Sequence, residues 1–161
     1  MRLFIALDLE KDNLEPLKEK LKNVKGRFVS DNNFHLTLAF LGDVSISRID
    51  ELKNIINSIN LHLNELKSTK VSTFHKNVIV INFEKNKELM NYQKKLTNLL
   101  KQNNFYFDDK PYIPHLTLIR NSNEFINFEY QKVFKIKGIH LFSSTLDKNG
   151  AIYDSLFVKY I

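Results

Sequence analysis

The feature that most constrains this chain is a four-residue string, His-Leu-Thr-Leu, that occurs twice. It is found in FHLTLAFLG, residues 34–42, and again in PHLTLIR, residues 114–120. Both copies have apolar or aromatic neighbours of the kind that favour β-strands. Because side chains alternate between the two faces of a strand, each copy places its histidine and threonine on one face and its leucines on the other. The sequence therefore predicts two similar strands, each anchored by leucines and each displaying an imidazole beside a hydroxyl.

A single His-x-Thr segment would say little, because such a pattern usually marks the polar face of an ordinary strand. Two identical copies favour a shared task for His35, Thr37, His115 and Thr117. If the two strands lie side by side about a pseudo-two-fold axis, a base and an acid can flank one phosphorus atom. Imidazole suits both roles because its unperturbed pKa is about 6.5. The threonine hydroxyls can donate to the non-bridging oxygens, whose charge grows during in-line displacement. The pattern alone does not say which histidine is the acid.

Composition narrows the class of protein. With 161 residues, of which 43% are hydrophobic, the chain has the size and core of a single domain spanning 1–161. It has no cysteine, which excludes a disulfide scaffold, a thiolate zinc site and a cysteine nucleophile. The formal net charge of +6 favours an anionic partner such as nucleic acid, although a lysine-rich surface is equally typical of ordinary solvation. No apolar run approaches the roughly 18 residues of a membrane span.

Hydrophobic periodicity predicts the element order β-α-β-β-α-β-β-α-β-β-β. Strands are expected at 1–9, 27–30, 35–42, 68–74, 77–83, the second motif, 131–145 and 151–160. Helices are expected after a capping box of Asp12 and Glu15, from Ser47, and over 86–103, with Gly26 closing the first helix. The fold class is therefore α+β: two pseudo-symmetric lobes of antiparallel sheet, with flanking helices, around a central groove. The first segment is expected to be a strand rather than a signal peptide, which favours a cytoplasmic location.

Several other residues are assigned ordinary roles. His62, His75 and His140 are interpreted as surface or hydrogen-bonded histidines. No H-E-x-x-H or similar spacing is present, so we expect no metal site. The chain also lacks a glycine-rich phosphate loop, which argues against an ATP-driven ligase or kinase.

The segments FHLTLAFLGDV and PYIPHLTLIR resemble the paired HxTx motifs of the two-histidine (2H) phosphoesterases. More narrowly, the chain resembles the RNA 2′,3′-cyclic phosphodiesterases, also known as 2′-5′ RNA ligases. RLFIALDL near the start and LFSSTLDKNGAIYDSLFVKYI at the end fall in the order of that family, so the resemblance covers almost the full length. Phe28 stands where a tryptophan would be expected, and an aromatic ring is retained.

The resemblance implies hydrolysis of an RNA 2′,3′-cyclic phosphate to a 2′-phosphate, without a metal or other cofactor. It implies that His35 is the proton donor to the departing 3′ oxygen and that His115 is the proton acceptor that activates water. Thr37 and Thr117 would bind the phosphate. The implied partner is RNA ending in a 2′,3′-cyclic phosphate, such as tRNA fragments or small oligonucleotides, and no membrane or obligate protein partner is implied.

Arg120 follows the second motif in a family-like HLTLxR arrangement and is a candidate for holding phosphate or the RNA backbone. Strand alternation opposes this assignment, since Arg120 should share a face with Leu116 and Leu118. Only a bulge or a strand end would bring it to the face of His115.

Three alternatives to the main hypothesis stay open. The chain could instead cleave 2′-5′ phosphodiester linkages or another cyclic nucleotide. From a different class, it could be an RNA-end-binding protein without catalytic turnover.

Overall fold

The structure, a computed structural model, describes residues 1–161 and combines three α-helices with nine strands. The strands are β1 (Arg2–Leu9), β2 (Arg27–Phe28), β3 (His35–Asp43), β4 (Glu65–Phe74), β5 (Val78–Phe83), β6 (His115–Arg120), β7 (Asn127–Glu129), β8 (Val133–Asp147) and β9 (Gly150–Tyr160). The helices are α1 (Glu15–Lys20), α2 (Ile49–Ser58) and α3 (Lys87–Gln102). Short 3-10 turns precede α1, β3 and α2 at Asp12–Leu14, Asp31–Asn33 and Ile46–Arg48.

All strand pairs are antiparallel, in the order β2-β6-β5-β4-β8-β1-β3, with β7 also paired to β4 and β9 to β8. The first half of this sheet comprises β3, β1, β8 and β9, and the second comprises β2, β6, β5, β4 and β7. The halves join where Glu65–Lys67 of β4 pairs with Val133–Lys135 of β8. The α+β class with an antiparallel sheet is therefore confirmed.

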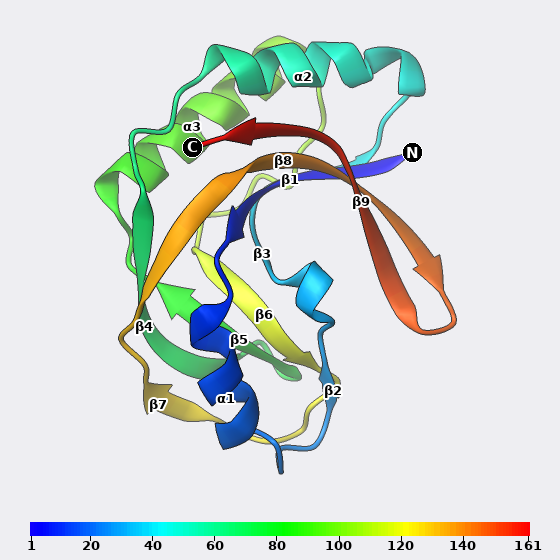
Figure 1. Ribbon diagram of the computed structural model, residues 1–161. Coiled ribbons are helices and arrows are strands. Elements are labelled where there is room, and N and C mark those ends of the chain that lie inside the picture. The colour runs from blue at the N-terminus through cyan, green and yellow to red at the C-terminus, as the bar shows by residue number, and fades with distance from the viewer.

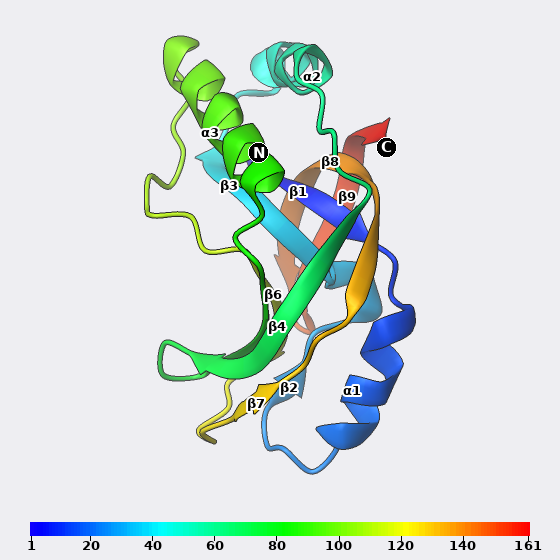
Figure 2. The same cartoon turned by 90° about the vertical axis from the view of Figure 1, so that its left-hand side faces the viewer.

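The two motif strands lie near opposite ends of the strand order, yet β3 and β6 contact each other. Both strands lie in the middle of the molecule in two perpendicular views (Figures 1 and 2). Helices α2 and α3 lie together at one end and α1 lies at the other (Figures 1 and 2). The sheet thus brings the two copies of the repeat together from distant parts of the chain.

One hydrophobic cluster of 35 buried residues draws on both halves of the sheet and on all three helices. The four motif leucines belong to it, and none is more than 2% exposed: Leu36, Leu38, Leu116 and Leu118. Burying a leucine side chain contributes roughly 1.5–3 kcal/mol, so these residues fix both motif strands to the core. None of the helices combines the length and hydropathy that a membrane crossing requires.

Two details of the first helix differ from the prediction. The capping box does not form: no side chain caps the 3-10 turn or α1, and the helix begins at Glu15 with Pro16 in its first turn. It also ends at Lys20, well before Gly26. Gly26 has φ +139°, and a Cβ there would lie 2.6 Å from Ile119 Cγ2, so this glycine permits close approach to β6.

Strand β7, only three residues long, was not predicted because so short a segment shows no periodicity.

Candidate active site

The first motif opens β3, and its side chains alternate as expected. His35 and Thr37 are half-buried, while the leucines that follow each of them are buried. In the ladder with β1, His35 lies opposite Asp8 and Thr37 lies opposite Ala6. Directly opposed residues on neighbouring strands project from the same face. Asp8 therefore shares a face with the motif histidine. In each half of the sheet, the term motif face is used below for the face that carries the motif histidine and threonine.

The second motif repeats this arrangement on β6. His115 and Thr117 are half-buried, and they lie opposite Asn82 and Val80 of β5. The partner strand β5 thus takes the place in the second half that β1 takes in the first. In this correspondence, Asn82 is the counterpart of Asp8.

Both motif strands carry a bulge at the same place, the second leucine. In β3, Leu38 is skipped, because Ile5 pairs with Ala39 and the next β1 residue pairs with Thr37. A bulge adds one residue to a strand, so side chains beyond it change face. Accordingly Ala39 is buried, and Phe40 is half-exposed on the motif face against the ring of Phe4, at 5.7 Å between centroids.

The bulge in β6 decides the position of Arg120. Leu118 is skipped there, because Ile79 pairs with Ile119 while the next β5 residue pairs with Thr117. Ile119 is consequently buried in the core, and Arg120 is exposed on the motif face. Arg120 therefore does not share a face with Leu116, because the bulge supplies the one exception to strand alternation that would bring it to the face of His115.

Hydrogen bonds from outside the ladder support both bulges and hold the motif strands together. The carbonyl of Leu38 accepts from Gln93 Nε2 at 3.2 Å, and the carbonyl of Leu118 accepts from the Val29 amide at 2.8 Å. The Tyr112 hydroxyl, in the segment that leads into β6, donates to the carbonyl of Thr37 at 2.9 Å. This last bond links one motif directly to the approach of the other.

His115 has a defined tautomer. Its Nδ1 lies 2.7 Å from the carbonyl oxygen of Ile113, which can only accept, so Nδ1 carries the proton. In the neutral ring the lone pair is then on Nε2, and the ring stacks on Phe74 at 4.7 Å between centroids. A neutral imidazole held in this tautomer can accept a proton at Nε2.

His35 has a different environment. Its ring packs against Phe142 at 4.3 Å and lies 6.1 Å from that of Tyr153, and its buried Nδ1 has no hydrogen-bond partner. Burial lowers the pKa of His35 to about 4, an effect that the Asp8 carboxylate opposes and that Lys11 and His140 reinforce. In the free protein this imidazole is therefore neutral at pH 7.

Asp8 is the residue that sequence reasoning missed. Its Oδ2 lies 3.7 Å from His140 Nε2 and 3.8 Å from Lys137 Nζ, while its Oδ1 is buried without a hydrogen-bond partner. His140 is hydrogen-bonded as predicted, with Nδ1 2.7 Å from Ser155 Oγ, but it also lies on the motif face. Alternation along RLFIALDL would have placed Asp8 on the face opposite Leu7 and Leu9, although nothing in the sequence paired that strand with β3.

The threonine hydroxyls are free. Neither Thr37 Oγ1 nor Thr117 Oγ1 makes a hydrogen bond within the protein, and neither atom is buried without a partner. Each can therefore donate to a ligand on the motif face. Throughout the chain, no group of three or more His, Cys, Asp or Glu side chains is arranged to hold a metal ion.

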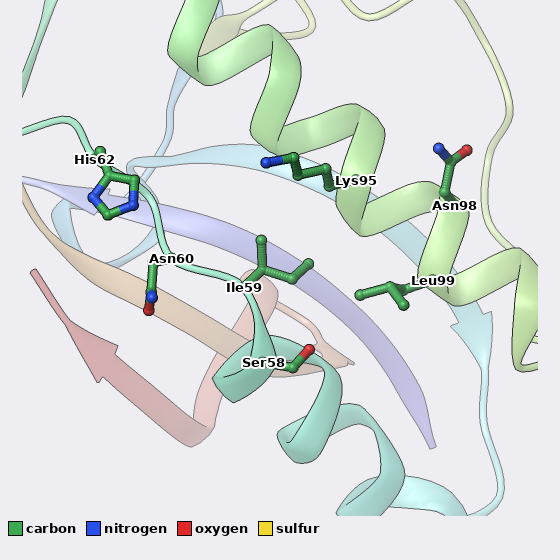
Figure 3. A pocket seen from close by; sticks show the side chains of 7 residues that line it. All are labelled: Ser58, Ile59, Asn60, His62, Lys95, Asn98 and Leu99. Atoms are coloured by element: carbon green, nitrogen blue, oxygen red, sulfur yellow. The ribbon is translucent and has the colours of Figure 1, made fainter.

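A separate pocket of about 500 Å³ lies between the end of α2 and α3 (Figure 3). Its lining includes His62, Lys95 and Asn98, and it contains none of the motif residues. The residues that the sequence singled out therefore do not lie in this pocket.

This geometry defines a class of α+β protein. Such a protein has two half-sheets, and each half-sheet presents a histidine and a threonine from a bulged strand. The sequence profile of the family described as LigT-like phosphoesterase matches residues 7–80 and again 81–153. Each match contains one copy of the motif, in keeping with the two-fold correspondence of the strands. The chain belongs to this phosphoesterase family.

Curated relatives carry a more specific name. A Methanocaldococcus jannaschii protein named RNA 2′,3′-cyclic phosphodiesterase is 29% identical over 171 residues, covering 96% of this chain and 97% of the relative. A Thermotoga maritima protein of the same name is 26% identical, covering 98% and 94%.

Solved structures share the fold. The protein TT0787 of Thermus thermophilus superposes with a TM-score of 0.87 at 20% identity, over 99% of this chain and 97% of that one. The E. coli LigT complex with 3′-AMP superposes with a TM-score of 0.82 at 22% identity, over 99% and 97%.

Proposed function

We propose that this protein hydrolyses the 2′,3′-cyclic phosphate at the end of an RNA, giving a 2′-phosphate and a free 3′ hydroxyl. The observation that carries the proposal is the placement of the two His-Thr pairs on the motif faces of β3 and β6, two strands that contact each other. The names of the curated relatives support the substrate class. We expect the protein to act as a single domain in the cytoplasm.

An asymmetry between the halves supports different roles for the two histidines. The counterpart positions beside the two imidazoles hold a carboxylate, Asp8, and a neutral amide, Asn82. A carboxylate favours the charged imidazolium, whereas an amide adds no charge. This supports His35 as the proton donor and His115, with Nε2 free, as the proton acceptor.

In the proposed reaction His115 Nε2 removes a proton from water as the water oxygen bonds to phosphorus. The bond between phosphorus and the 3′ oxygen breaks, and His35 transfers its proton to that oxygen. Thr37 and Thr117 donate hydrogen bonds to the non-bridging oxygens. His115 ends protonated and His35 neutral, and exchange with solvent restores the starting state.

The low pKa of His35 has to be raised for this role. The cyclic phosphate is an anion, and placing it near the imidazole favours the protonated form. Asp8 acts in the same direction. The substrate therefore helps to charge the group that will protonate its leaving oxygen.

The test is to incubate the protein, with EDTA present, with a short RNA that ends in a 2′,3′-cyclic phosphate, and to identify the product. We expect a 2′-phosphate. A 3′-phosphate would reverse the leaving group and hence the two histidine roles. Tight binding without product would favour the RNA-end binder. Faster cleavage of an internal 2′-5′ linkage or of another cyclic nucleotide would indicate a different substrate of the same phosphoesterase chemistry.

The pH profile provides a prediction about Asp8. The active form has His35 charged and His115 neutral. When the pKa of the proton donor lies below that of the proton acceptor, the donor sets the acid limb of the kcat/KM profile. Because the pKa of His35 is lowered to about 4, we expect the acid limb near pH 4. Because Asp8 raises that pKa, Asp8→Asn should move the acid limb to lower pH and reduce the plateau about tenfold. Rates from pH 3 to 9 measure both effects.

Asp50→Asn on α2 is the control for the loss of one carboxylate, because Asp50 is exposed and lies outside the motif strands. A native circular dichroism spectrum at pH 3 would show that the acid limb is not unfolding. An unchanged acid limb in Asp8→Asn would contradict the electrostatic role of Asp8.

A further inference from the structure

His140 is a third imidazole on the motif face of the first half-sheet. Strand β1 lies between β3 and β8, and Ala6 of β1 pairs with Thr37 on one side and with His140 on the other. The ring of Phe142 contacts two imidazoles, with its centroid 4.3 Å from that of His35 and 4.9 Å from that of His140. The third imidazole therefore belongs to the surroundings of the proposed proton donor.

Asp8 contacts His140 and lies opposite His35, and its two carboxylate oxygens have different environments. Oδ2 lies 3.7 Å from His140 Nε2. Oδ1 is buried without a hydrogen-bond partner, and so is Nδ1 of His35 on the neighbouring strand. Buried polar atoms without partners are costly and rare. Directly opposed residues have Cβ atoms about 4.5–5.5 Å apart, so a small side-chain rotation can join these two unpartnered atoms.

The surroundings of His140 fix its tautomer. Burial lowers the pKa of His140, so the ring is neutral at pH 7. The carboxylate of Asp8 opposes this effect on the pKa, and the ammonium groups of Lys137 and Lys11 add to it. A neutral ring has one N–H and the carboxylate can only accept, so the proton lies on Nε2. Nδ1 then accepts from the hydroxyl of Ser155, whose oxygen is 2.7 Å away.

We propose that His140 is a positioning residue for the proton donor: its Nε2 donates to Asp8 Oδ2, and the carboxylate held in this way presents Oδ1 to Nδ1 of His35. This inference rests on the proposed function for the role of His35. A hydrogen bond at Nδ1 fixes the orientation of an imidazole and leaves Nε2 as its reacting atom. The carbonyl of Ile113 does the same for His115 in the second half.

The first experiment compares two variants of His140 on two substrates. His140→Leu keeps an apolar side chain against Phe142 and has no N–H, whereas His140→Gln carries an amide N–H at about the reach of Nε2. The substrates are a short RNA with a 2′,3′-cyclic phosphate and the same RNA with sulfur in place of the 3′ oxygen. A departing thiolate needs no proton, because a thiol has a pKa of about 8.5. His62→Leu, at an exposed position outside the motif strands, is the control for the loss of one imidazole.

We expect His140→Leu to reduce kcat about tenfold on the oxygen substrate, with KM little changed, because one hydrogen bond to a charged group is lost. On the sulfur substrate the same variant should stay within about a factor of two of the native rate, since that reaction needs no proton donor. His140→Gln should recover most of the loss. Ser155→Ala, an exposed change that frees Nδ1 of His140, should reduce the rate on the oxygen substrate about threefold and give no further loss in His140→Leu.

Heteronuclear NMR of the histidine ring nitrogens tests the positioning without catalysis. In the native protein near pH 7, His35 should have its proton on Nδ1 and His140 should have its proton on Nε2. In His140→Leu, the ring of His35 should become a mixture of the two tautomers, because Asp8 is no longer held. His62→Leu should leave the signals of His35 unchanged.

An unchanged tautomer of His35 in His140→Leu would overturn the proposal. So would an equal loss of rate on the two substrates, which would assign His140 a purely structural role. If His140→Leu does not fold, Ser155→Ala has to show the same difference between the substrates for the proposal to stand. A protein that shows the change of tautomer but hydrolyses neither substrate would refute the proposed function and leave the positioning of His35 intact.

Discussion

His35→Ala and His115→Ala should each reduce kcat by about 10²-fold or more, because each change removes one positioned proton-transfer group. Neither ring anchors its strand, since the buried leucines of each motif do so. We therefore expect both variants to fold. Single-turnover rates on the cyclic-phosphate RNA, with circular dichroism as the check on folding, measure the effect. His62→Ala is the matched control, because His62 lies outside the motif strands.

A substrate with a better leaving group separates the two roles. If the 3′ oxygen is replaced by sulfur, the thiolate that departs needs no proton, because a thiol has a pKa of about 8.5. This substrate should restore most of the rate in His35→Ala and little of it in His115→Ala. Rescue of His115→Ala instead would exchange the roles, and a native rate in either alanine variant would remove that histidine from the mechanism.

The second large effect is expected at the threonines. Thr37→Val and Thr117→Val keep the branched shape of the side chain and remove only the hydroxyl. A single donor to the developing negative charge typically contributes about 10²–10³-fold to kcat, so we expect a loss of about 10²-fold in each variant. The loss should fall on kcat more than on KM, since the charge on the non-bridging oxygens grows only in the transition state.

Serine variants at the same positions restore the hydroxyl, and Thr37→Ser and Thr117→Ser should recover most of the rate. Thr97→Val on α3 is the control for a threonine away from the motif face. A loss confined to KM would show ground-state binding only. Native kinetics in either valine variant would exclude that hydroxyl from phosphate binding.

Much of the fold could be predicted from the sequence because its signals are local. Alternation placed the motif leucines in the core, and helical periodicity located α2 and α3 to within a few residues. The Asn86 side chain caps α3 by accepting from the Leu89 amide, which is a short-range signal as well. Prediction failed where the outcome depends on distant partners. The expected role of Gly26 was wrong because the glycine is required by contact with β6 rather than by the end of a helix.

The sequence by itself determined that two His-Thr pairs would be displayed from two leucine-anchored strands, since a period of two residues is a local property of extended chain. Only the tertiary structure decided what surrounds each imidazole. It set Asp8 beside His35 and Asn82 beside His115 through strand pairing, and it turned Arg120 toward the motif face through a bulge. Register and bulges depend on how a whole strand packs against its neighbours, so no local pattern encodes them.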